Sequence, residues 1–220
     1  MSMMDELRKV LKPWLADNGM KPTCRKNIFY EDRGIFFIVL ELQPLYNEGF
    51  LVNMVISFMW SSDQMSYDYE YKSFRVNSLH PLGATFFDSP TFDKDMAYIQ
   101  SKIIERINEY REHSDLAVLE DRLANREDFR ARSVAGYKDR DIDLANVRMM
   151  MGKVEEAKRL YINATNYKIP HPFAQEMVDA NFDKMFFDER MLQIINENRA
   201  GLSRKFKIKL ESIDSFEYLK

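Results

Sequence analysis

Asp32, Glu41 and Gln43 are the residues whose types and spacing come nearest to a catalytic set. Two carboxylates on neighbouring strands can share a magnesium ion and activate a water molecule for hydrolysis. Asp32, however, falls in an expected hairpin turn, and Glu41 lies at the far end of the returning strand, roughly 25 to 30 Å away at about 3.3 Å per residue. A metal-dependent hydrolase or nuclease that uses Asp32 and Glu41 is therefore an alternative interpretation with unfavourable geometry.

The other reactive side chains form no recognisable set. His80, His113 and His171 are far apart in the sequence, and none has the paired spacing of zinc ligands on a helix. Cys24 is the only cysteine, which excludes a disulfide within the chain and an all-cysteine metal site. The seven glycines are scattered, which excludes a P-loop and a dinucleotide-binding fingerprint. The sequence therefore predicts no catalytic residue, no metal ligand and no cofactor.

A row of tyrosines is the first candidate binding surface. Tyr67, Tyr69 and Tyr71 alternate with charged residues and predict a strand that carries the three rings on one face. Exposed rings could serve as a stacking platform, and buried rings with hydroxyls at the rim are the alternative.

Alternating apolar residues predict an antiparallel sheet in the first half of the chain. A helix is expected first, at residues 3–18, because apolar residues recur there at helical spacing. Three strands follow with a short glycine-containing hairpin loop between the first two, at residues 27–31, 35–43 and 50–60. Asn53 and Ser57 lie opposite the apolar side of the third strand, so we expect one core face and one wetter face.

The second half has a helical period. After Ser89-Pro90, helices are expected near residues 96–110, 116–123, 141–151, 153–166 and 181–198. Ser114-Asp115 is expected to cap the second of these helices, Gly152 to lie in the turn between the third and the fourth, and Gly201 to end the last one. Polar residues near 111–115 mark a seam between the two halves. The predicted fold class is α+β: residues 1–112 form a helix and an antiparallel sheet, and residues 113–220 form a mainly helical region with a C-terminal strand.

The expected C-terminal strand contains the densest basic cluster of the chain. Lys205, Lys207 and Lys209 alternate there with apolar residues. Lysines on an edge strand discourage pairing with a second molecule, so we expect them to be protective and not to bind nucleic acid.

The first half resembles an uncharacterised bacterial domain-of-unknown-function family. The likeness covers about residues 5–75 and consists of a helix, the turn Asn18-Gly19-Met20-Lys21, the strand Phe29-Tyr30-Glu31 and Gly34 before two long apolar strands. Met20 and Glu31 replace the phenylalanine and arginine usual in that family. The resemblance implies a fold and no activity.

Residues 141–170 resemble a single tetratricopeptide-like helical hairpin. Gly152, Ala157 and Tyr161 stand near the spacing of that repeat, in which small residues let two helices approach. Arg148 and Tyr161 are the candidate binding residues of this hairpin. No second copy lies 34 residues before or after, and one hairpin alone makes no solenoid groove.

Composition bounds the remaining possibilities. With 45% hydrophobic, 30% charged and 13% aromatic residues, the chain has the profile of a folded globular protein. Its net charge of −3 offers no general attraction to nucleic acid. The charged N-terminus lacks a signal-peptide core, and no apolar run approaches the roughly 18 residues of a membrane span, so a cytoplasmic location without membrane contact is expected.

Together these observations favour a non-enzymatic protein-interaction module whose partner is another protein. The alternatives are the hydrolase that uses Asp32 and Glu41, and a small-ligand-binding protein with an apolar pocket between sheet and helices.

Overall fold

The alternating segments pair into an antiparallel sheet and the helical segments form helices, which confirms the α+β class. The computed structural model describes residues 3–46, 48–60, 73–76, 84–125, 134–167 and 171–217. The strands are β1 (Lys21–Pro22), β2 (Ile28–Asp32), β3 (Phe36–Leu45), β4 (Gly49–Phe58), β5 (Ser73–Val76) and β6 (Thr85–Phe86). The helices are α1 (Met3–Asp17), α2 (Phe92–Glu112), α3 (Leu116–Ala124), α4 (Val134–Met150), α5 (Val154–Thr165), α6 (Pro172–Asp179) and α7 (Lys184–Phe206).

The strand order follows the chain, β1-β2-β3-β4-β5, with β6 paired to β4. The predicted hairpin is confirmed: β2 and β3 pair antiparallel with Asp32 opposite Phe37. In the turn between them Gly34 has a φ of 78°, a conformation that glycine adopts without steric cost. Asp32 accepts a hydrogen bond from the Gly34 amide at 2.9 Å and so closes the turn.

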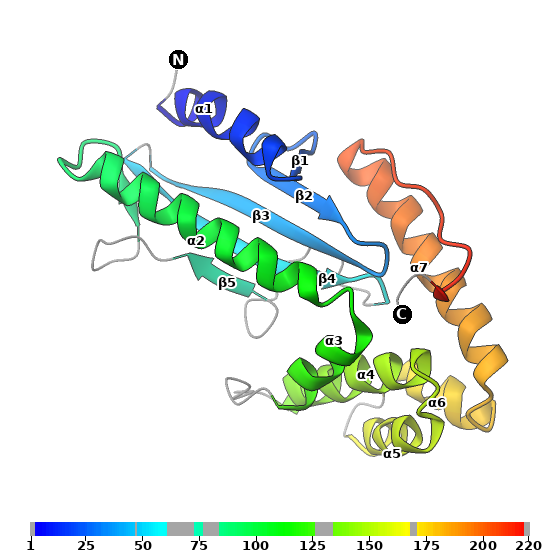
Figure 1. The fold of residues 1–220 in the computed structure, drawn as a ribbon. Coiled ribbons are helices and arrows are strands. Elements are labelled where there is room, and N and C mark those ends of the chain that lie inside the picture. Colours follow the sequence, from blue (N-terminus) through cyan, green and yellow to red (C-terminus); the bar gives the residue numbers. More distant parts are fainter. Residues whose placement is uncertain are drawn as a thin grey trace. The chain divides into compact units, whose positions relative to one another are not determined.

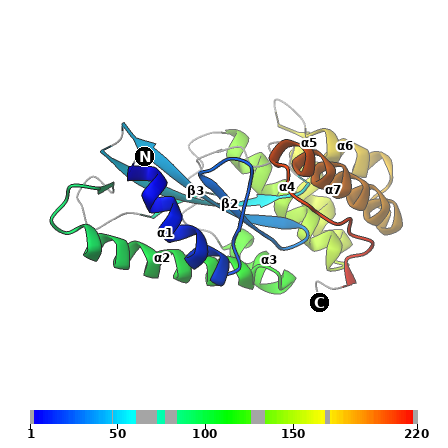
Figure 2. The same cartoon turned by 90° about the horizontal axis from the view of Figure 1, so that it is seen from above.

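α1 and α2 lie on the same face of the sheet (Figures 1 and 2). That face carries the alternate apolar residues of the two longest strands, among them Ile38, Leu40, Met54 and Ile56, which are all buried. Arg111 at the end of α2 donates to Glu31 of β2 at 2.8 Å and to the Asn18 carbonyl at 2.6 Å. These bonds join α2 to both the sheet and the end of α1.

The expected wetter face of the third strand is wrong. All ten residues of β4 are buried, including Asn53 and Ser57. Asn53 lies opposite Glu41 and donates hydrogen bonds from Nδ2 to Glu41 at 3.2 Å and to Gln43 at 3.1 Å. A buried amide is stable only when it is hydrogen-bonded, and β3 supplies the acceptors. The alternation therefore placed Asn53 and Ser57 correctly opposite the apolar side of the strand, but it did not predict that this second face is also buried.

α4 and α5 form the predicted helical hairpin. Gly152 lies in the turn with a φ of 76°, as expected. Ala157 is fully buried and Tyr161 donates from its hydroxyl to Asn146 of α4 at 2.7 Å. A small residue and a shared hydrogen bond allow the two helices to approach closely.

The expected C-terminal strand is wrong. α7 continues through Gly201 to Phe206, and residues 207–217 contain no strand. Lys207 has a φ of 51°, and the next amide, of Ile208, donates to the Ser203 carbonyl at 3.2 Å, so the helix ends in a left-handed turn. The helix and this cap form in place of the predicted strand, because a short alternation of basic and apolar residues fits a helix end as well as a strand.

The chain divides into two compact units. The first, the sheet unit, comprises residues 1–111 and 198–211, and the second, the helical unit, comprises residues 112–197 and 212–220. The first boundary falls in the predicted seam, whereas the return of residues 198–211 to the sheet unit was not predicted.

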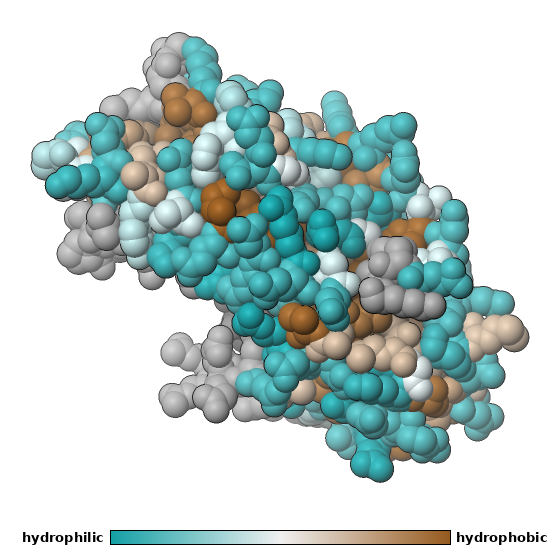
Figure 3. Space-filling model, in the orientation of Figure 1, coloured by the Kyte–Doolittle hydropathy of each residue, from teal (hydrophilic) through white to brown (hydrophobic). Residues whose placement is uncertain are grey.

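The face drawn in Figure 3 is mainly hydrophilic with separate hydrophobic patches. Over the described residues, no helix is long and apolar enough to cross a membrane.

Candidate functional site

Asp32 forms an ion pair with an arginine of α7 in the sheet unit. The Arg199 guanidinium donates to both oxygens of Asp32 at 2.7 Å and also to the Gly34 carbonyl at 2.8 Å. The side chain of Arg199 is only 6% exposed, so this two-pronged bond is shielded from water. Asp32 therefore has a structural partner in the position where a metal ion would have to bind.

Glu41 is not close to Asp32. The register pairs Asp32 with Phe37, and Glu41 lies four residues further along β3, or about 13 Å away at about 3.3 Å per residue. The separation of 25 to 30 Å expected from the sequence was too large, because the hairpin brings β2 back along β3. Across the described ranges, no three histidine, cysteine, aspartate or glutamate side chains gather as metal ligands would.

The hairpin candidates Arg148 and Tyr161 both have partners within the helical unit. Tyr161 is fully buried, and burial raises the pKa of its hydroxyl well above its ordinary value. Arg148 bonds Glu120 of α3 at 2.9 Å and contacts Glu156 at 3.5 Å. The tyrosine row Tyr67, Tyr69 and Tyr71 lies outside the described residues.

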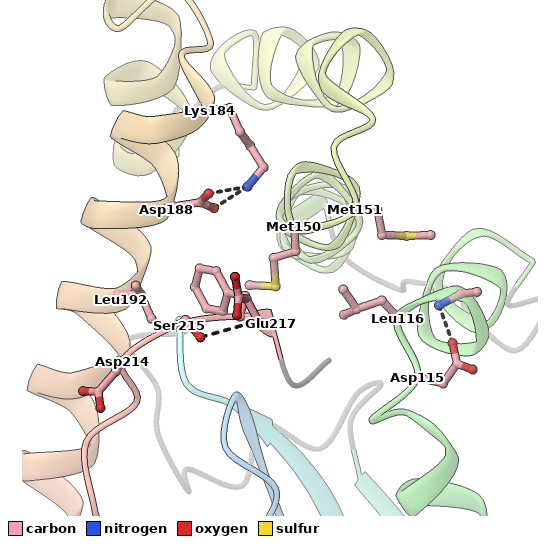
Figure 4. Close-up of a pocket in the computed structure, with 12 residues that line it drawn as sticks. Asp115, Leu116, Met150, Met151, Lys184, Asp188, Leu192, Asp214, Ser215 and Glu217 are labelled. Carbon is pink, nitrogen blue, oxygen red and sulfur yellow. Dashed lines mark hydrogen bonds and ion pairs between the residues drawn. The ribbon is translucent and has the colours of Figure 1, made fainter. Parts of the chain in front are cut away.

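A partly open cavity of about 580 Å³ lies in the helical unit (Figure 4). Its lining residues come from the start of α3, the end of α4, α7 and the C-terminal segment: Asp115, Leu116, Ala117, Met150, Met151, Lys184, Asp188, Leu192, Asp214, Ser215, Phe216 and Glu217. We call this cavity the groove. Neither Arg148 nor Tyr161, the predicted binding residues that the structure describes, is among its lining residues.

Local sequence positions the helical walls of the groove. Asp115 caps α3 by accepting from the Ala117 amide at 2.8 Å, as the sequence predicted, and so places Leu116 at the first helical position. Met150 and Met151 come at the end of α4, immediately before the Gly152 turn. Lys184, Asp188 and Leu192 recur every four residues and therefore lie along one side of α7.

The C-terminal segment forms the last wall because α7 holds it. Asn196 donates from Nδ2 to the Ile213 carbonyl at 2.9 Å and accepts from the Ile213 amide at 2.8 Å. The Ile213 side chain is itself buried. This pair of hydrogen bonds uses only the backbone of Ile213. One asparagine therefore orients the following Asp214–Glu217 segment towards the groove.

The groove combines an apolar lining with a negative rim. Leu116, Met150, Met151, Leu192 and Phe216 supply the apolar atoms. Among the described lining residues Lys184 is the only basic one, and Asp188 pairs with it at 2.5 Å (Figure 4). The carboxylates of Asp214 and Glu217 are exposed beside it.

The described lining residues of the groove contain no catalytic pair. Its lining includes neither histidine nor cysteine, and Ser215 accepts from the Glu217 amide at 3.4 Å without a base beside it among the lining residues. The apolar lining and the negative rim suit an apolar group that lies beside a positive charge.

Comparison with protein-family models, curated proteins and solved structures gave no match. The two resemblances stated from the sequence therefore remain predictions.

Sequence reasoning missed most of the groove. Its walls come from segments around residues 115, 150, 188 and 215, which no spacing rule connects. Two local signals were present: the Asp115 cap, which was predicted, and the paired methionines before Gly152, which could have marked an adaptable apolar surface.

Proposed function

We propose that the helical unit is a protein-interaction module that binds a partner's apolar side chain in the groove. The observation that carries this proposal is the meeting of two methionines, two leucines and a phenylalanine beside exposed carboxylates. Methionine side chains are flexible and polarizable, which suits them to surfaces that accommodate partner side chains.

The charges around the groove indicate which charge a partner segment should carry. Because Asp188 compensates Lys184, the carboxylates of Asp115, Asp214 and Glu217 leave the rim negative. A complementary segment carries lysine or arginine next to a leucine, methionine or phenylalanine. The Asn196 contact with Ile213 provides a precedent, since α7 already holds an extended segment of this chain through its backbone.

Selection of short random peptides on the full chain tests the proposal. Selected peptides are expected to share an apolar residue flanked by basic ones and to bind with a dissociation constant of about 1 to 100 μM, as a small groove allows. Leu192→Asp should weaken binding at least about tenfold, because it places a charge in the apolar lining.

Ile162→Asp is the matched control. Ile162 is an exposed apolar residue of α5 in the same unit and does not line the groove. Equal weakening by both variants, or selection without a shared apolar and basic pattern, would refute the assignment of the groove.

A small apolar ligand is the second candidate. The cavity volume of about 580 Å³ lies within the range of roughly 300 to 1,000 Å³ that is typical of ligand sites. A small molecule that raised the melting temperature of the wild type but not of Leu192→Asp, with no peptide selected, would favour this alternative.

A further inference from the structure

Two segments of the sheet unit that are distant in sequence and contact each other around Phe206 carry seven exposed basic residues. The segments are residues 18–30 and 199–210, and neither contains an aspartate or a glutamate. The exposed side chains are Lys21, Arg25, Lys26, Arg204, Lys205, Lys207 and Lys209. We call them the basic surface.

Contacts centred on Phe206 hold the two segments together. The Cys24 amide donates to the Phe206 carbonyl at 3.0 Å. The Arg25 guanidinium lies 5.2 Å from the centre of the Phe206 ring, and the Lys205 ammonium lies 5.4 Å from it. Phe206 is buried, so its ring anchors cations from both segments. The charges are therefore concentrated by the fold and not merely by the sequence.

The basic surface is not neutralised within the described part of the chain. None of its seven side chains forms an ion pair with a described residue. The nearby acids of β2 are engaged elsewhere, Glu31 by Arg111 and Asp32 by Arg199. Like charges gathered without partners repel one another, and an external polyanion relieves that repulsion.

The protective role expected for these lysines depended on an edge strand. Lys205 belongs to α7 instead, and Lys207 and Lys209 follow it outside any strand. Because these lysines do not lie on an edge strand, protection against strand pairing with a second molecule does not explain their presence.

We propose that the basic surface binds the phosphate backbone of duplex nucleic acid without sequence selectivity. Five of the seven residues are lysines, which act as point charges towards phosphate and not as two-pronged readers of bases. The surface includes no exposed aromatic ring that could stack on an unpaired base, and a duplex presents the densest row of phosphates. This proposal is independent of the groove, which belongs to the helical unit.

Salt-dependent binding of a labelled duplex to the full chain is the test. With about four to five phosphate contacts, the logarithm of the association constant should fall with the logarithm of salt at a slope of about −3.5 to −4.5. DNA and RNA duplexes should bind alike. Lys207→Ala/Lys209→Ala should weaken binding about tenfold and reduce the slope by about 2, since each lost contact contributes about 0.9.

Lys94→Ala/Lys102→Ala is the matched control, because it removes two charges from α2 in the same unit and should leave duplex affinity and slope unchanged. Cys24 gives a second readout. It is exposed, and its thiol lies 3.8 Å from the Lys205 carbonyl, so bound duplex should slow its alkylation by a maleimide.

Three results would overturn the proposal: no binding at about 50 mM salt, equal weakening by the control, or no protection of Cys24 despite binding. Tighter binding to phosphatidylserine vesicles or to polyglutamate than to duplex would also refute it, because another polyanion would then be the preferred partner.

Discussion

At the scale of single residues, buried and half-buried charges connect segments that lie far apart in the chain. Arg199 and Asp32 are separated by 167 positions and bond within the sheet unit. Glu120 bonds Arg148 of α4 and Lys153 of the following turn within the helical unit. Removing one partner of such a bond leaves the other desolvated, so single substitutions should be costly.

Arg199→Met should destabilise the chain by about 3 kcal/mol, because the largely buried Asp32 would lose its partner. Chemical denaturation measures the change. Asp32→Asn on top of Arg199→Met should restore part of the loss, since a neutral amide costs less to bury than a carboxylate.

Arg33→Met is the matched control in the same hairpin. Arg33 pairs with Glu31 at 3.4 Å and is 33% exposed, so the loss should stay below about 1 kcal/mol. Similar losses from both arginine variants would contradict the importance of the Arg199 pair.

Glu120 should make stability depend on pH. Burial opposes its ionisation, but the hydrogen bonds and charges of Lys153 and Arg148 prevail and lower its pKa below the ordinary 4.5. Its contribution is therefore complete above about pH 5 and is lost as the pH falls through the lowered pKa. Glu120→Gln should be less stable at neutral pH and should lose less stability on acidification.

Denaturation curves at pH 7 and at about pH 3 measure that difference. Glu105→Gln serves as the control: the pKa of Glu105 is also lowered, by Lys102, but the pair is exposed and should contribute little. Parallel pH dependence of the wild type and Glu120→Gln would show that another group is responsible.

At the scale of elements, glycines mark where backbones approach or turn. Gly49 begins β4, and a Cβ built there would lie 2.1 Å from the Thr85 carbonyl oxygen of β6. Gly152 has a positive φ in the α4–α5 turn, and a Cβ built there would meet no described atom within 4 Å. A side chain at position 49 would clash with the backbone of β6, whereas a side chain at position 152 would be disfavoured only by the positive φ.

Gly49→Ala should therefore cost more than Gly152→Ala. Backbone cannot move aside cheaply, so we expect a loss of about 2 to 4 kcal/mol for Gly49→Ala and about 1 kcal/mol for Gly152→Ala. Thermal unfolding of both variants gives the comparison. A larger loss at Gly152 would show that β6 does not pair with β4 in solution.

At the scale of the whole molecule, the C-terminal part of the chain completes both units. Residues 198–211 belong to the sheet unit, although they follow the helical segments in sequence. They contribute Arg199 to Asp32, the Asn198 amide to the Met59 carbonyl at 2.6 Å and the Phe206 carbonyl to the Cys24 amide. A fragment cut at the predicted seam would lose all three.

A fragment of residues 1–112 should therefore fail to unfold cooperatively, or should unfold at a clearly lower temperature than the full chain. Circular dichroism during heating measures this. Adding residues 198–211 through a flexible linker should recover part of the stability, because the effective concentration of a tethered segment is high. A fragment as stable as the full chain would contradict the assignment of residues 198–211 to the sheet unit.

The sequence by itself determined the local architecture. Helical spacing indicated α1 and α7, alternation indicated β3 and β4, and the residue types Asp115 and Gly152 indicated a cap and a turn. These features follow from spacing along a few residues of chain, where periodicity and backbone preferences act directly.

Only the tertiary structure decided what those elements contact. The burial of Asn53, the pairing of Asp32 with Arg199, the groove and the basic surface all depend on residues brought together from distant segments. Alternation reports which side chains share a face, not what covers that face, and a short alternating run such as residues 205–210 fits a helix end as well as a strand. Long-range packing resolves both ambiguities, because burial and hydrogen bonding are satisfied over the whole chain and not within a local window.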